Sequence, residues 1–131
     1  MKYVPLYAAA LALLFVALSV RTLKLRRLLK IAIGDSGNQQ MIRAMRVHAN
    51  FAEYTPIAVL LLYMAESSGN NPVIINVLCL ALLTGRSAHA FGVSQVNENY
   101  KFRVFGMAMT LTTIICASLL IIYLFLAKSA A

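Results

Sequence analysis

The sequence is poor in charged residues, in acids and in cysteine, and each shortage excludes a class of protein. Charged side chains make up 12% of its 131 residues, about half of their usual share in soluble domains. A soluble protein of this size could not bury so much apolar surface, so we predict a polytopic membrane protein. The two cysteines, Cys79 and Cys116, each lie inside an apolar run and form neither a disulfide framework nor a metal-ligand spacing.

Familiar catalytic and nucleic-acid signatures are also missing. The chain has no Ser-His-Asp order, no H-E-x-x-H motif and no Gly-rich phosphate loop. Its formal net charge of +8 is not accompanied by an aromatic-and-basic RNA signature. The cations lie mostly in segments 21–46 and 86–103, between apolar runs. We interpret them as the excess of Lys and Arg that marks cytoplasmic loops, and we expect no nucleic-acid partner.

Apolar runs and polar breaks predict four helices, at about 3–30, 39–66, 73–93 and 103–127, in one domain over residues 1–131. The expected fold is all-α, an integral membrane four-helix bundle. Lys2 is followed by an apolar stretch without a clear cleavage site, so the first helix is expected to stay in the protein. The first and third connections hold nearly all cations, which predicts that both face the cytoplasm and both termini the other side.

The second predicted helix carries a polar stripe. At 3.6 residues per turn, Arg43, Arg46, Asn50 and Glu53 fall within about 80° of one another, whereas His48 points away. Polar groups from two other helices are expected at the same membrane depth, namely Arg86, His89 and Arg103. A buried charge costs about 2.5–3.5 kcal/mol on insertion scales, so a mostly cationic cluster predicts a site for an anionic ligand.

Simpler interpretations of these residues remain open. Arg46 and Glu53 could form one ion pair that only fixes helix packing, and Glu53 could instead pair with Arg86 or with a ligand ammonium. His48 could be an interface or headgroup contact, and His89 a packed histidine. The basic residues at the exit of the first helix could be lipid-phosphate anchors; they include Lys24, Arg26, Arg27 and Lys30.

The motif Arg46-x-His48-x-Asn50-x-x-Glu53-Tyr54-x-Pro56 resembles the signature of the membrane-associated proteins in eicosanoid and glutathione metabolism (MAPEG). Gly85-Arg86-x-x-His89 resembles the family's third-helix motif, and Arg103, in Arg-x-x-Gly-Met, stands where the family places its catalytic arginine. The Gly-Asp pair at 34–35 is similar to small bacterial members. Val93 departs from relatives that have a glutathione-contacting tyrosine there.

This resemblance implies a homotrimer in a bacterial inner membrane, with glutathione as co-substrate between neighbouring subunits and no metal. By residue matching, the implied glutathione-binding residues are Arg46, His48, Asn50, Glu53, Tyr54, Arg86 and His89. Arg103 is the implied catalytic residue, and His48 would serve the neighbouring subunit's site. The basic residues at the exit of the first helix could contact the glycine carboxylate.

The expected function is a membrane glutathione transferase or peroxidase in detoxification, which acts on an apolar small molecule or lipid that partitions into the bilayer. One alternative is a non-catalytic lipid-binding or scaffold protein of the same fold. Another is a small multidrug transporter that uses Glu53. Such transporters usually carry their glutamate in the first helix, which here contains no acid.

Overall fold

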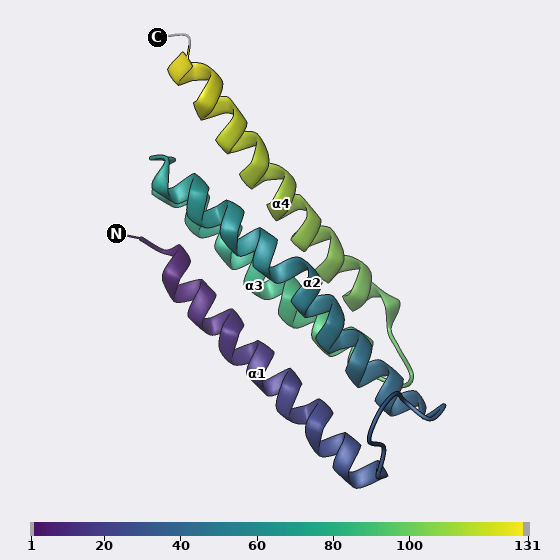
Figure 1. Ribbon diagram of the computed structural model, residues 1–131. Coiled ribbons are helices and arrows are strands. Elements are labelled where there is room, and N and C mark those ends of the chain that lie inside the picture. The colour runs from purple at the N-terminus through teal and green to yellow at the C-terminus, as the bar shows by residue number, and fades with distance from the viewer. Residues whose placement is uncertain (1, 130–131) are drawn as a thin grey trace.

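The computed structural model of the chain, which describes residues 2–129, consists of four long helices that lie side by side (Figure 1). They are α1 (Val4–Leu29), α2 (Gln39–Ser67), α3 (Pro72–Ser94) and α4 (Tyr100–Ser129). No strand occurs among these residues. The predicted all-α, four-helix fold is therefore confirmed.

The helices do not form a closed square. Helices α2, α3 and α4 all contact one another, while α1 packs against α2 and α3 and makes no contact with α4. Figure 1 accordingly shows α1 and α4 on opposite sides of the central pair. Apolar side chains fill the interior, among them Val47, Phe51, Leu62, Ile75 and Leu82. The outer faces of α1 and α4 stay rich in exposed apolar residues, as expected for helices that face lipid.

Asparagines define where three of the helices begin. Asn38 Oδ1 accepts a hydrogen bond from Met41 N and caps α2, and Asn71 caps α3 just before Pro72. Asn99 Oδ1 accepts from Lys101 N. Because of this last cap, α4 begins three residues before the predicted start at 103, and Arg103 lies in its first turn.

Three helices in the described part of the chain, α1, α3 and α4, are long and apolar enough to cross a membrane. Helix α2 has a similar length of 29 residues. The first half of α2 carries the polar stripe, and this makes α2 less hydrophobic than the other three helices. Helix α2 runs alongside these three helices through the bundle (Figure 1). Its polar residues therefore lie at the same membrane depth as the residues of α1, α3 and α4 beside them.

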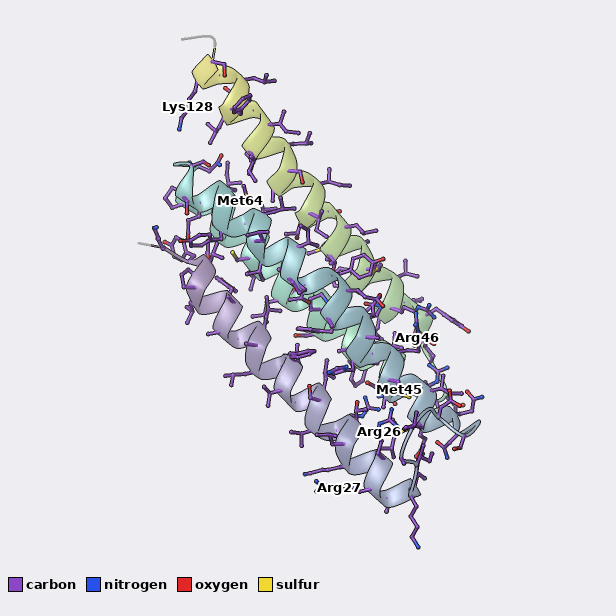
Figure 2. The ribbon with its side chains drawn as sticks, viewed as in Figure 1. Arg26, Arg27, Met45, Arg46, Met64 and Lys128 are labelled. Atoms are coloured by element: carbon purple, nitrogen blue, oxygen red, sulfur yellow. The ribbon has the colours of Figure 1, made fainter. Side chains whose placement is uncertain are left out.

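One end of the bundle is strongly basic. The connections α1–α2 and α3–α4 lie together at this end, and the N- and C-termini lie at the other (Figure 1). All cations except Lys2 and Lys128 belong to segments 21–46 and 86–103. Figure 2 shows Arg26, Arg27 and Arg46 toward the basic end and Lys128 at the opposite one. By the positive-inside rule, the basic end is the predicted cytoplasmic end.

Helices α3 and α4 approach closely at two glycines, Gly85 and Gly106. A Cβ atom at Gly106 would overlap the Gly85 carbonyl oxygen and lie 2.6 Å from the His89 backbone nitrogen. A Cβ atom at Gly85 would lie 2.7 Å from Met109 Cβ. Small residues let membrane helices bring their backbones together in this way. The contact places His89 of α3 against the first two turns of α4, which begin the functional region described below.

A carboxylate from α2 caps α1 at the end opposite the basic one. Glu66 Oε1 accepts hydrogen bonds from the backbone N–H groups of Tyr3 and Val4, the latter at 3.3 Å. These groups belong to the first turn of α1, where no residue of the same helix can accept their protons. The negative charge also interacts favourably with the positive end of the helix dipole. From the sequence, Glu66 is predicted only as the last residue of a helix.

Glu66→Ala is expected to lower the free energy of unfolding by about 1–3 kcal/mol, because two partly buried N–H groups lose a charged acceptor. Thermal unfolding of the purified chain in detergent measures the loss. Glu66→Gln keeps one acceptor oxygen and should lose less. Ser67→Ala changes an exposed neighbour and is the control. An unchanged melting temperature in Glu66→Ala would contradict the capping role.

Candidate functional site

A cavity of about 220 Å³ lies at the basic end, between α2, α3 and the start of α4. It collects four of the residues predicted for the site: Arg46, Asn50, His89 and Arg103. The remaining lining residues are Gln39, Ile42, Arg43, Val93 and Glu98. Three arginines against one carboxylate make this cavity cationic, which is the character predicted from the stripe on α2. We call it the arginine cavity.

Arg86 lies behind the arginine cavity and supports it. Its side chain is fully buried, and its Nη2 donates to Asn50 Oδ1 over 2.9 Å. The guanidinium carbon also lies 5.2 Å from the centroid of the Phe51 ring. Arg86 therefore orients the amide of Asn50, a residue that lines the cavity.

Several buried polar atoms in and beside the arginine cavity lack a hydrogen-bond partner within residues 2–129. They are Arg86 Nε and Nη1, His89 Nδ1 and Glu98 Oε1. A buried donor or acceptor without a partner costs about 1–3 kcal/mol, and more when it is charged. Native structures contain few such groups, and a functional role is one reason for those that remain. The cluster thus favours binding of a polar, acceptor-rich molecule beside Asn50.

Glu98 connects two arginines across the cavity. Its Oε2 accepts a hydrogen bond of 2.9 Å from Arg43 Nη1, which also donates to the Val93 carbonyl oxygen over 3.2 Å. Arg103 Nη1 is 3.7 Å from Glu98 Oε1, beyond hydrogen-bond distance. The Glu98 side chain is 5% exposed, whereas that of Arg103 is 52% exposed. Arg43 is therefore fixed, and Arg103 can turn toward a ligand.

The sequence alone did not indicate a role for Glu98. Its place in a polar connection, outside every helix, gave no periodicity that would link it to α2. One signal was available, because Glu98 is the only acid in the cation-rich segment 86–103. An isolated carboxylate among cations is a natural ion-pair partner. The sequence predicts the segment 94–102 only as a connection between two helices.

Glu53 and Tyr54 lie outside the arginine cavity. Glu53 is exposed and Tyr54 half-buried, about one turn farther along α2 than Asn50. The alternative ion pair between Arg46 and Glu53 does not form in this structure, and neither residue has an oppositely charged partner within residues 2–129.

His48 faces α1 instead of the arginine cavity. Its Nε2 lies 3.0 Å from Ser19 Oγ, and its ring stacks on Phe15 with 4.7 Å between centroids. The side chain thus fastens α2 to α1, in keeping with its position off the polar stripe.

The basic residues at the exit of α1 also lie away from the arginine cavity. Lys24 lines a separate groove, and the others line a shallow depression at the end of α1, namely Arg26, Arg27 and Lys30. Arg26 Nη1 donates to the Gly34 carbonyl oxygen over 3.0 Å and so fastens the α1–α2 connection.

Comparison with known proteins supports what the polar motifs indicate. The profile of the MAPEG family matches residues 4–123. The chain belongs to the MAPEG family. It is also 33% identical over 117 residues to the inner membrane protein YecN of Escherichia coli K12, a match that covers 89% of this chain and 85% of that protein. YecN of Escherichia coli O6:H1 strain CFT073 matches with the same figures.

Membership of this family confirms the family resemblance of the motifs. Together with the three apolar helices, it confirms an integral, multi-pass membrane protein. The relative's name as an inner membrane protein agrees with the membrane predicted for this chain.

Proposed function

We propose that this MAPEG protein is a membrane glutathione transferase or peroxidase that binds glutathione in the arginine cavity. The observation that carries the proposal is the convergence of Arg46, Asn50 and Arg103 on one cavity, backed by the buried Arg86 with two unsatisfied donors. Three helices that are distant in sequence supply these groups. Helix packing alone does not require such an arrangement.

The chemistry of glutathione fits this arrangement. The tripeptide has two carboxylates, one ammonium and a thiol, so it needs several cationic donors and at least one acid. Guanidinium groups bind carboxylates through paired, charge-assisted hydrogen bonds. Arg46 faces the cavity without an acidic partner among the described residues and is free to bind one carboxylate. Glu98 or Glu53 can accept the ammonium.

Arg103 is the proposed catalytic residue. A free thiol has a pKa of about 8.5, and a nearby cation lowers it, so more of the nucleophilic thiolate exists at neutral pH. Arg103 is half-exposed and only loosely paired with Glu98, so its guanidinium can lie beside the sulfur. In conjugation the thiolate sulfur bonds to an electrophilic carbon, and the leaving group departs with its electron pair. The apolar surroundings would admit electrophiles that are dissolved in the bilayer.

Glu53 supports assembly with further copies of the chain. It lies near the middle of the 29-residue α2, is exposed and has no salt-bridge partner within residues 2–129. A charge held against lipid at that depth costs about 2.5–3.5 kcal/mol or more. A neighbouring subunit that covers this face removes the cost and encloses the arginine cavity. We propose the homotrimer that the family resemblance implies, in which Glu53, Tyr54 and the neighbour's His48 come within reach of glutathione.

Arg46→Ala is expected to weaken glutathione binding at least about tenfold, because a hydrogen bond to a charged group contributes about 1.5–3 kcal/mol. Calorimetric titration of the purified full chain with reduced glutathione measures this. Lys101→Ala removes an exposed cation of the same end that does not line the cavity, and it should leave binding unchanged. Equal losses in both variants would refute a specific site.

The same preparation separates an enzyme from a non-catalytic lipid-binding member of the fold. An enzyme of the proposed kind converts bound glutathione to the thiolate, which is visible in the ultraviolet difference spectrum, and it conjugates chlorodinitrobenzene. Glutathione binding without a thiolate signal or turnover would favour the lipid-binding or scaffold alternative. Absence of glutathione binding would refute the proposal.

A further inference from the structure

A second groove is larger than the arginine cavity. It has a volume of about 950 Å³ and lies between α1 and the α3–α4 connection, at the basic end. The lining from α1 and α2 is Ala17, Val20, Arg21, Lys24, Leu25, Leu28 and Gln40, and Ser94, Gln95, Val96 and Asn97 line the other side. None of these residues lines the arginine cavity. Within one copy of the chain the groove is therefore separate from the arginine cavity.

The wall formed by α1 changes character along its length. Ala17, Val20, Lys24 and Leu28 follow one another at helical spacing, so they form one stripe on the helix surface. At 1.5 Å per residue, Ala17 lies about 10 Å closer to the middle of the bundle than Lys24. The stripe is thus apolar toward the membrane interior and cationic where the headgroups begin.

The two cations of the groove are held differently. Arg21 donates from Nη1 to Ser94 Oγ and from Nη2 to the Ser94 carbonyl oxygen, the latter over 3.4 Å. This contact fixes the guanidinium at the C-terminal end of α3. Lys24 is exposed and has no hydrogen-bond or ion-pair partner within the described residues. Its ammonium group is free to meet an anion.

The remaining lining residues favour an anion that carries an apolar chain. Gln40, Gln95 and Asn97 offer amide N–H donors, and none of the lining residues is an acid. The apolar part of the groove includes Val20 and Val96, which are both exposed large hydrophobic residues. Exposed apolar residues beside unpaired cations, at the depth of the headgroups, match the two halves of a phospholipid.

We propose that this groove binds one anionic phospholipid. Its phosphodiester lies at Lys24 and Arg21, with amide donors from Gln95 or Asn97, and one acyl chain runs along Val20 and Ala17. Free phosphate shares the headgroup chemistry and leaves the apolar half of the groove unused. We therefore expect a lipid, and not free phosphate, to occupy the groove. Because the lipid would touch both α1 and the α3–α4 connection, it also joins the helix that has no contact with α4 to the rest of the bundle.

The test is a titration of the purified full chain, in a neutral detergent, followed by native mass spectrometry. The probes are phosphatidylglycerol, phosphatidylcholine of the same acyl chains, and inorganic phosphate. Phosphatidylglycerol is expected to remain bound at least about fivefold more tightly than phosphatidylcholine, since each cation near the surface contributes about 1 kcal/mol. Inorganic phosphate should neither bind detectably nor displace the lipid, because it cannot use the apolar wall.

Two variants of the same helix separate a site from diffuse charge. Lys24→Gln is expected to weaken retention of phosphatidylglycerol about fivefold. Arg27→Gln removes an equally exposed charge three residues away that does not line the groove, and it should change nothing. Both variants should keep the wild-type melting temperature. Equal loss in the two variants, equal binding of both lipids, or displacement by inorganic phosphate would each overturn the proposal.

Discussion

Arg103→Ala is expected to lower the turnover of glutathione conjugation by about 100-fold or more while glutathione still binds. Removing one group that stabilises developing charge typically costs about 10²–10³ in turnover. Arg103 lies in the first turn of α4, is 52% exposed and is only 3.7 Å from its single acidic neighbour, Glu98. Its removal leaves the Arg43–Glu98 hydrogen bond in place. The fold should therefore survive, and the loss should fall on the chemical step.

The pH profile distinguishes loss of a thiolate-stabilising charge from a general disturbance. Without the cation, the pKa of the bound thiol rises toward its free value of about 8.5. Activity of Arg103→Ala should then increase with pH over a range where the wild type is already level. Arg103→Lys keeps a charge and should recover part of the activity, and Lys101→Ala should behave as the wild type. A profile that falls without shifting would contradict the proposed role of Arg103.

The polar stripe shows how far sequence reasoning reaches for this chain. Helical spacing alone grouped Arg43, Arg46, Asn50 and Glu53. The first three line one cavity in the structure, whereas Glu53 lies outside it. The same spacing separated His48, which indeed lies on the side that faces α1. Within a helix, periodicity is enough, because 3.6 residues per turn determine which positions share a face.

Helical spacing does not predict the hydrogen-bond or ion-pair partner of each polar group. Glu98 pairs with Arg43 across 55 residues of sequence, and Glu66 caps α1 across 62 and 63 residues. Such pairs depend on which helices become neighbours. Arg86 illustrates the same limit. Its spacing of three residues from His89 predicts that the two share a helix face, but it does not predict that the Arg86 side chain is fully buried and bonded to Asn50. Contacts between helices arise from packing, which a single-helix pattern does not encode.

Gly106 carries the second large effect, because the close approach of α3 and α4 depends on it. In an exposed helix, replacing glycine with alanine stabilises by up to about 1 kcal/mol. At Gly106 the added methyl group would meet backbone atoms of Gly85 and His89, which cannot rotate away as a side chain can. Gly106→Ala is therefore expected to destabilise the protein by about 1–3 kcal/mol or more, a reversal of the usual sign.

Catalysis should suffer more than stability in this variant. Relief of the overlap moves α4 away from α3, and with it Arg103 relative to His89 and the arginine cavity. A displacement of about 1 Å in a positioned group can cost about 100-fold in rate. Thermal unfolding and the conjugation assay measure the two effects together, with Ala108→Leu as a control that adds bulk to an exposed position of the same helix. If Gly106→Ala melts at or above the wild-type temperature, the backbone contact does not hold α3 and α4 together, and the placement of Arg103 must have another cause.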